Sequence, residues 1–274
     1  MALSRPLLIA LAAAAVILAG CSSSKEEGPE YVERPVDAIY NDAVDAALGG
    51  DYHKAAPLFD EVERQHPYSV WATQAQLMAA YSLYQTNKYD DAVNALDRFI
   101  KLNPGHANVD YAYYLKALSY YERIVDVGRD QKITQQALDI FTELVKRFPD
   151  SKYSRDARLK LDLTRNHLAG KEMSIGRYYL RGGRTMAAIN RFKSVIVKFD
   201  TTDQVPEALH RLTEAYLALG LTDEAKRTAA VLGHNYPGSE WYQDSYSLML
   251  TGKTQDEATK AADPGVFGWG LWIF

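Results

Sequence analysis

The side chain with the clearest chemistry in this sequence is its single cysteine, Cys21. An uninterrupted apolar run at residues 7–18 lies just before it, and Arg5 is the one charged residue ahead of that run. The run is too short to cross a bilayer, which takes roughly 20 residues, but it matches the core of a secretory signal, about 7 to 15 residues. A buried or redox-active thiol is the alternative, but a polar serine tract follows Cys21 at once and no partner exists for a disulfide.

The tetrapeptide Leu18-Ala19-Gly20-Cys21 resembles the bacterial lipobox. In a lipobox the cysteine thiol is acylated, the preceding peptide is removed, and the cysteine becomes the first residue of the mature protein. The resemblance predicts a signal peptide at 1–20, a lipid anchor on Cys21 and a flexible leader at 21–36. Ser22 stands where an aspartate would favour the inner membrane, so we expect the periplasmic face of the outer membrane.

No other group of residues forms a catalytic or metal-binding motif. The sequence lacks a phosphate-binding Gly-x-x-x-x-Gly-Lys, a Gly-x-Ser-x-Gly nucleophile turn and a His-Glu-x-x-His zinc motif. A formal net charge of −4 does not favour a nucleic-acid partner. We therefore expect no catalytic residue, no metal and no cofactor, and a function in binding. The six histidines are scattered along the chain: His53, His66, His106, His167, His210 and His234.

A pattern of alanine, an apolar residue four positions later and a helix stop twelve positions later occurs five times. A residue that favours a tight turn, Gly or Asn, stands five positions before the alanine in four of the five. The alanine lets two helices approach closely, and the residue at plus four lies one turn further along the same face. The five triplets are Ala55-Phe59-Pro67, Ala92-Leu96-Pro104, Ala137-Phe141-Pro149, Ala188-Phe192-Asp200 and Ala225-Ala229-Pro237.

This pattern resembles the tetratricopeptide repeat, in which a tight turn joins two helices. It predicts an all-α fold, a tetratricopeptide-repeat solenoid of about five helix pairs over residues 37–250. The alanines are further apart than in a regular repeat, so extra helix or loop is expected at 105–135 and 150–182. The charged segment 240–257 suits a closing helix, and residues 251–274 are expected to form a linker and a tail.

Stacked helix pairs present a surface built from their first helices, and those helices are rich in tyrosine here. Tyrosines at three- and four-residue spacing also pack in cores with their hydroxyls at the rim. For any single tyrosine this structural role is more common than a role in binding. Arginines could bind carboxylates through two N–H groups. The candidates are Tyr81, Tyr84, Tyr111, Tyr113, Tyr114, Tyr120, Tyr121, Tyr178 and Tyr179, with Arg98, Arg181, Arg184 and Arg191.

Three segments carry a more specific resemblance, residues 95–111, 147–153 and 178–191. Together with the lipobox, they resemble the BamD family, the tetratricopeptide-repeat lipoproteins of the β-barrel assembly machinery. The resemblance covers roughly residues 10 to 245, and the interrupted third and fourth repeats are a feature of that family. It implies a non-enzymatic scaffold and substrate receptor that aids the folding and insertion of outer-membrane proteins.

The resemblance also implies partners. In that family the C-terminal repeats dock on the periplasmic domains of the barrel protein BamA, and the N-terminal repeats receive unfolded outer-membrane proteins through a C-terminal signal of alternating aromatic residues. Other Bam lipoproteins and the outer-membrane lipid complete the expected contacts. Carried onto this chain, the BamA-docking residues are Tyr178, Tyr179 and Arg191, and the substrate-groove residues are Tyr68, Trp71, Tyr81, Tyr84, Arg98, Tyr111 and Tyr114.

The family resemblance does not account for the aromatic stretch at residues 265–274, which holds Phe267, Trp269, Trp272 and Phe274. An exposed apolar segment is normally covered by something. Three locations remain open: the membrane interface, where tryptophan is favoured, the surface of BamA, and the chain's own substrate groove.

Two other functions share parts of the pattern. A periplasmic tetratricopeptide adaptor that coordinates cell-wall synthesis or division would have the repeats, but such proteins often lack a lipid anchor. A lipoprotein enzyme that remodels peptidoglycan would need paired acids on a groove. The acidic pairs here, Asp90-Asp91 and Asp223-Glu224, fall in the first turn of a predicted second helix, where they favour the helix dipole.

Overall fold

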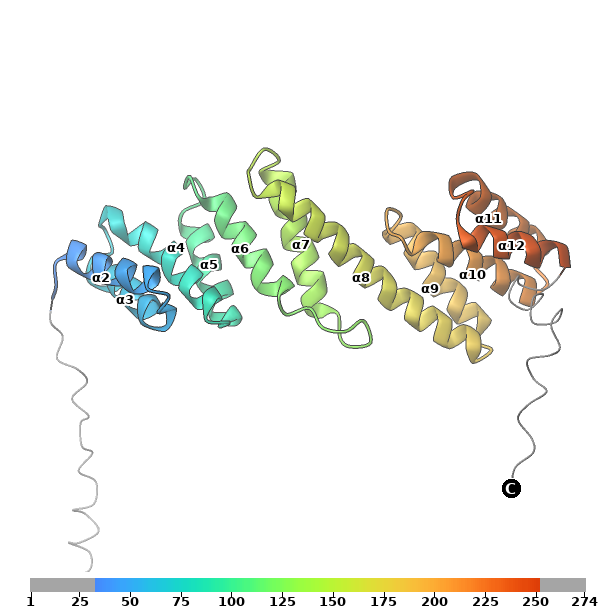
Figure 1. Cartoon of the computed structure of the whole chain (residues 1–274), viewed down its shortest axis with the longest axis horizontal. Coiled ribbons are helices and arrows are strands. Elements are labelled where there is room, and N and C mark those ends of the chain that lie inside the picture. The colour runs from blue at the N-terminus through green and yellow to red at the C-terminus, as the bar shows by residue number, and fades with distance from the viewer. Residues whose placement is uncertain (1–32, 252–274) are drawn as a thin grey trace, which may run out of the picture. The chain divides into compact units, whose positions relative to one another are not determined.

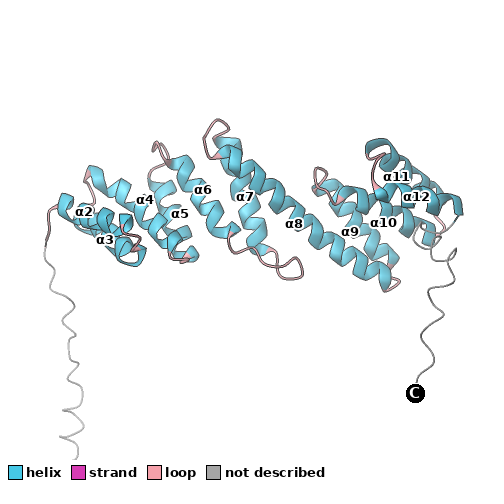
Figure 2. Cartoon of the chain, viewed as in Figure 1, coloured by secondary structure: helices cyan, strands magenta, loops and turns pink. Residues whose placement is uncertain are grey.

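The computed structural model describes residues 33–251, and its regular structure is entirely helical. Eleven α-helices follow one another in chain order, and no strand occurs within 33–251, which confirms the all-α prediction. Figures 1 and 2 show each helix lying beside the next one in sequence. The predicted signal peptide, Cys21 and the aromatic tail lie outside the described residues. The helices are α2 (Val36–Leu48), α3 (Tyr52–Gln65), α4 (Val70–Gln85), α5 (Tyr89–Leu102), α6 (Val109–Tyr121), α7 (Lys132–Arg147), α8 (Ser154–Arg181), α9 (Thr185–Lys198), α10 (Val205–Ala218), α11 (Thr222–Asn235) and α12 (Glu240–Thr251).

The helices form five pairs, α2 with α3 through α10 with α11, and α12 follows the last pair. In four pairs a tight turn joins the two helices, and that turn contains one residue with φ between 59° and 78°. Glycine and asparagine adopt this left-handed conformation at lower cost than other residues. The four residues are those predicted from the sequence: Gly50, Asn87, Gly183 and Gly220.

Every second helix ends in the same backbone bend. The residue after the helix has φ between −128° and −134°, and its N–H still bonds the carbonyl four residues earlier. A proline follows this residue in four pairs and disfavours a helical conformation for it. Phe199 adopts the same bend before Asp200, so the fourth stop forms without proline. The five bent residues are His66, Asn103, Phe148, Phe199 and Tyr236.

The repeated alanines lie where the helices touch. All five are fully buried, as are the apolar residues at plus four in the first four repeats. The fifth repeat differs, because Ala229 is only half-buried and Leu232, one turn further along α11, supplies the buried side chain. An alanine side chain is too short to fill that position. The solenoid core is therefore a series of clusters, each shared between neighbouring pairs.

The extra residues of repeats three and four take two different forms. Residues 122–131 make an irregular loop between α6 and α7, whereas the fourth repeat lengthens its first helix, α8, to 28 residues. A helix of that length spans about 42 Å. Lys171 Nζ on α8 donates to the carbonyl oxygens of Gly128 and Arg129 at 2.8 and 3.1 Å. The loop is thereby held against the long helix.

Helix α12 closes the stack by packing on α10 and α11. His210 Nδ1 on α10 lies 2.8 Å from Ser245 Oγ, and the Trp241 ring lies 5.4 Å from the imidazole. Burial lowers the pKa of His210, and the charge of Arg211 acts in the same direction. The contact is therefore made by a neutral imidazole. None of the helices within 33–251 is both long enough and apolar enough to span a bilayer.

The close packing of α8 against α9 predicts a sensitive position at Gly176 of α8. A methyl group there would lie 2.4 Å from a ring atom of Phe192, which is fully buried. We expect Gly176→Ala to lower the free energy of unfolding by about 1–3 kcal/mol in urea titrations, although alanine has the higher helix propensity. Gly105→Ala, where nothing lies within 4 Å, is the control. Equal stability of the two variants would contradict this packing.

The contact between α10 and α12 predicts a loss of stability in mild acid. Unfolded histidine takes up a proton near pH 6.5, whereas His210 in the folded chain resists protonation. Its contribution is thus complete above that pH and declines as the pH falls below it. We expect unfolding free energies measured from pH 7.5 to 5 to fall less steeply in His210→Asn. An unchanged pH slope would refute this role, and exposed His53→Asn serves as the matched control.

Candidate functional site

Tyrosines from the first helices of repeats two and three come together with a tyrosine that precedes α8. We call this surface the tyrosine face: Tyr81 and Tyr84 on α4, Tyr111 and Tyr114 on α6, and Tyr153. All five are half-buried. The Tyr153 ring lies 5.1 Å from both Tyr111 and Tyr114 and stacks on Tyr114 at an interplanar angle of 21°. Tyr81, Tyr84 and Tyr111 pack against the same buried cluster between α4, α5 and α6. The five rings therefore form one surface across three repeats.

Hydrogen bonds hold the tyrosine face in place. Tyr114 donates its hydroxyl proton to Asp156 at 2.6 Å, and Lys160 Nζ also donates to Asp156. Burial raises the pKa of Tyr111 and Tyr114, and the bond to Asp156 raises that of Tyr114 further. Burial opposes ionisation of Asp156, but the bonds from Tyr114 and Lys160 outweigh it and lower the pKa of the carboxyl group. The face therefore presents neutral phenols beside an ionised carboxylate.

Two further tyrosines extend this surface. Tyr52 begins α3 and contacts Tyr81 edge-on at 5.8 Å, and Tyr89 begins α5 and contacts Tyr84 at 5.7 Å. The sequence prediction missed Tyr52, Tyr89, Tyr153 and Asp156 as site residues. A signal existed for the first two, because each tyrosine follows the turn residue of its repeat by two positions, after Gly50 and after Asn87.

Two of the predicted groove residues lie at the other end of α4. Tyr68 precedes the helix and is fully exposed, and Trp71 in its first turn packs against Tyr40 of α2 with ring centroids 4.7 Å apart. Along the helix axis Trp71 and Tyr84 are about 20 Å apart. The structure thus brings Trp71 to α2, and it places neither Trp71 nor Tyr68 on the tyrosine face.

Arg98 also lies apart from the tyrosine face. It projects from α5 and donates to Glu63 of α3 at 3.2 Å, and Glu63 also accepts from Gln76 of α4 at 2.8 Å. Half of the Arg98 side chain is exposed, so the ion pair itself contributes little. Its visible role is to link the second helices of repeats one and two.

Of the predicted docking residues, Tyr178 and Tyr179 lie near the end of α8 and Arg191 lies on α9, and the three residues are divided between two hollows. Tyr179 and Arg191 line a cleft of about 360 Å³ with Glu172, and Arg191 donates to Glu172 at 3.2 Å. The Tyr178 ring, 63% exposed, contacts that of Tyr179 at 5.8 Å. Tyr178 itself lines a separate hollow of about 280 Å³ with Arg181, the last residue of α8, and Arg184, which precedes α9.

The chemistry available on these surfaces suits recognition. The tyrosine face offers partly exposed aromatic rings, hydroxyl groups and one ionised carboxylate, which together fit aromatic side chains of an extended peptide. The hollows at the end of α8 offer arginine and tyrosine, which are frequent at protein interfaces. Within residues 33–251, no three or more His, Cys, Asp or Glu side chains are arranged to hold a metal ion.

Five stacked helix pairs with alanine at the contacts define the class, a tetratricopeptide-repeat protein. Residues 32–232 match the family described as "Outer membrane lipoprotein" (YfiO). Over 242 residues the chain is 50% identical to the outer membrane protein assembly factor BamD of Caulobacter vibrioides, which covers 88% of this chain and 79% of that protein. It is 46% identical over 243 residues to the BamD of Rickettsia prowazekii, with 89% and 96% covered. The chain belongs to the BamD family.

The bond between Tyr114 and Asp156 predicts a measurable contribution to stability. Tyr114→Phe keeps the ring and its stack on Tyr153 but removes the donor to an ionised acceptor. We expect the free energy of unfolding at pH 7 to fall by about 1 kcal/mol. Tyr120→Phe is the control, because the hydroxyl of Tyr120 has no hydrogen bond to a described residue. This variant should leave the free energy of unfolding unchanged. A loss of the same size in both variants would show that the bond contributes nothing specific.

Proposed function

We propose that this protein is an outer membrane protein assembly factor, acting as a non-enzymatic scaffold and substrate receptor in the β-barrel assembly complex. The observation that carries the proposal is the match to BamD over 88–89% of the chain. The relatives named above are assembly factors and not cell-wall adaptors. The tyrosine face and the hollows at the end of α8 supply two separate surfaces for the two kinds of partner that such a role requires.

The protein is held at the periplasmic face of the outer membrane through acylated Cys21. Residues 1–20 serve as the signal peptide, and the leader that begins at Cys21 reaches the first helix at Val36. The lipobox supports this anchor. A receptor for barrel precursors benefits from such a tether, because it keeps the receptor close to the membrane that its substrates enter.

The tyrosine face receives unfolded outer-membrane β-barrel proteins. Partly exposed rings at Tyr81, Tyr84, Tyr111 and Tyr114 can take aromatic side chains of an extended substrate segment in edge-on or offset contact. Arg98, Tyr68 and Trp71 lie outside this surface, because Arg98 pairs with Glu63 of α3 and Trp71, near Tyr68 in the sequence, packs against Tyr40 of α2. This division makes the four tyrosines the centre of substrate binding.

The hollows at the end of α8 dock on the periplasmic domains of BamA. Arg191 is 42% exposed beside Glu172, so its guanidinium retains N–H groups for a carboxylate of the partner. Tyr178 provides an exposed ring in the neighbouring hollow, where it contacts the half-buried Tyr179. Other Bam lipoproteins bind elsewhere on the solenoid.

Variants of Arg191 and of the pair Tyr111 and Tyr114 test the docking surface and the substrate surface separately. Arg191→Glu is expected to reduce BamA recovered with the full-length lipoprotein from detergent-solubilised membranes by about tenfold. Tyr111→Ala with Tyr114→Ala is expected to reduce photocrosslinking of a peptide that ends in alternating aromatic residues and phenylalanine, again by about tenfold.

Each variant is the control for the other, because each should retain the interaction that the other loses. Helicity measured by circular dichroism shows that both are folded. If Arg191→Glu still co-purifies fully with BamA, the docking surface is wrong. If the tyrosine variant still crosslinks the peptide fully, the substrate surface lies elsewhere.

A further inference from the structure

Helix α12 carries large side chains along two neighbouring faces. The inner stripe includes Trp241 and Met249, which pack against the last core cluster. The outer stripe consists of Tyr242, which also packs partly against that cluster, and of Tyr246 and Leu250, which are 57% and 67% exposed. The outermost helix of a solenoid normally turns a polar face outward, because no further repeat covers it. The outer stripe of α12 is aromatic and aliphatic instead.

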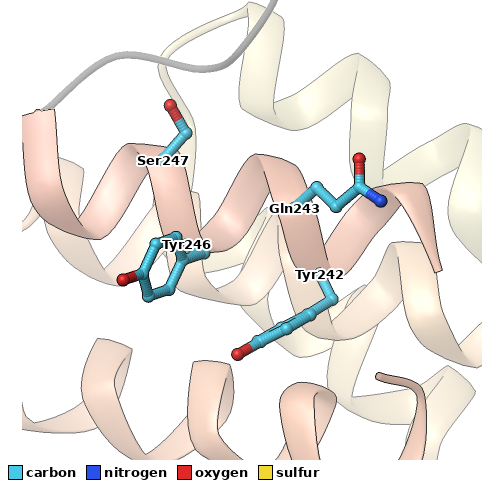
Figure 3. Close-up of a pocket in the computed structure, with 4 residues that line it drawn as sticks. All are labelled: Tyr242, Gln243, Tyr246 and Ser247. Atoms are coloured by element: carbon cyan, nitrogen blue, oxygen red, sulfur yellow. The ribbon is translucent and has the colours of Figure 1, made fainter. Parts of the chain in front are cut away.

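A surface cleft lies beside the outer stripe. A cleft of about 430 Å³ is lined by Tyr242, Gln243, Tyr246 and Ser247, and the two tyrosine rings project from the same side of the helix (Figure 3). Their centroids are 6.3 Å apart. The Tyr242 ring lies over Gly233 of α11, where even a methyl group would come within 2.5 Å of it. One face of this ring is therefore fixed by α11, and the cleft beside it is formed in advance.

The sequence that follows α12 supplies matching chemistry. Residues 252–264 are mostly polar, and residues 265–274 then hold two tryptophans, two phenylalanines and no charged side chain. Thirteen residues can span about 40 Å when extended. Helix α12 is about 18 Å long. The polar segment is thus long enough for the aromatic segment to return along the whole outer stripe.

We propose that residues 265–274 pack against the outer stripe of α12 and occupy the cleft beside Tyr242 and Tyr246, so that the chain caps its own solenoid. Tryptophan and phenylalanine rings contact the two tyrosines edge-on or offset, and Leu250 extends the apolar contact. The contact is intramolecular, so the linker keeps the effective concentration of the aromatic segment high. This proposal concerns the end of the stack and does not depend on the function proposed above.

Limited proteolysis of the full-length protein in detergent tests the contact. Chymotrypsin cuts after aromatic residues, so packing protects the bonds after Phe267 and Trp269. We expect Tyr246→Lys with Leu250→Lys to speed cleavage at these bonds roughly tenfold, because a charged stripe no longer holds the segment. Leu48→Lys, at an exposed leucine of α2, is the control and should cleave at the wild-type rate.

A second measurement keeps the test independent of any effect of lysine on helix α12. With p-benzoylphenylalanine in place of Tyr246, ultraviolet light should crosslink this position to residues 265–274 of the same chain, shown by mass spectrometry of a mixture of isotope-labelled and unlabelled protein. Equal cleavage rates in wild type and the lysine variant overturn the proposal. So do crosslinks between chains, which indicate a second copy, or protection that appears only with phosphatidylethanolamine and phosphatidylglycerol vesicles, which indicates the membrane.

Discussion

The close contact between helices at the repeated alanines is the constraint on which the rest of the structure depends. A single helix pair cannot bury its own apolar face, so each pair must pack against its neighbours. Ala55, Ala92, Ala137, Ala188 and Ala225 are fully buried, and the helices can approach each other only because these side chains are small. The left-handed turn residues and the bent helix ends serve this contact, since they return the chain at the right point for the next helix to pack. The cooperative unit is therefore a pair together with its neighbours.

This way of burying the core leaves the edges of the first helices available for recognition. Between the second and third repeats, Phe99 and Leu115 are buried in the cluster that the tyrosine face borders, while Tyr81, Tyr84 and Tyr111 pack against its rim. Their rings are thus held by the core on one side and partly exposed on the other. The expected core role of tyrosine and its proposed role in substrate binding are two sides of the same residue, and the structure does not require a choice between them.

The parts of the structure that depend on local spacing could be predicted from the sequence. Gly50 and Asn87 adopt the predicted turn conformation, because a turn between paired helices requires positive φ whatever surrounds it. The sequence could not predict whether the extra residues of repeats three and four form a loop or a longer helix. The spacing of the repeated alanines gives only the number of extra residues, and that number is the same in both cases. The position of Arg98 could not be predicted either. Its partner Glu63 lies 35 residues away, and the packing of α3 against its neighbours determines that the two side chains meet. Sequence proximity within α4 likewise grouped Trp71 with Tyr84, although 13 residues of helix separate them.

The lengthened helix α8 is what gives the two proposed surfaces a fixed relation. Tyr153 and Asp156 at its start belong to the tyrosine face, and Glu172 and Tyr179 near its end line the cleft that contains Arg191. A continuous hydrogen-bonded helix fixes the distance and orientation between residues at its two ends better than two helices joined by a turn would. The loop at residues 122–131 is bonded to α8 through Lys171, between the two ends, so the two irregular features of repeats three and four act on the same element. The interruption of the repeat pattern at this point therefore has a physical consequence, because a regular repeat of two short helices would place a flexible turn between the residues proposed for substrate and those proposed for docking.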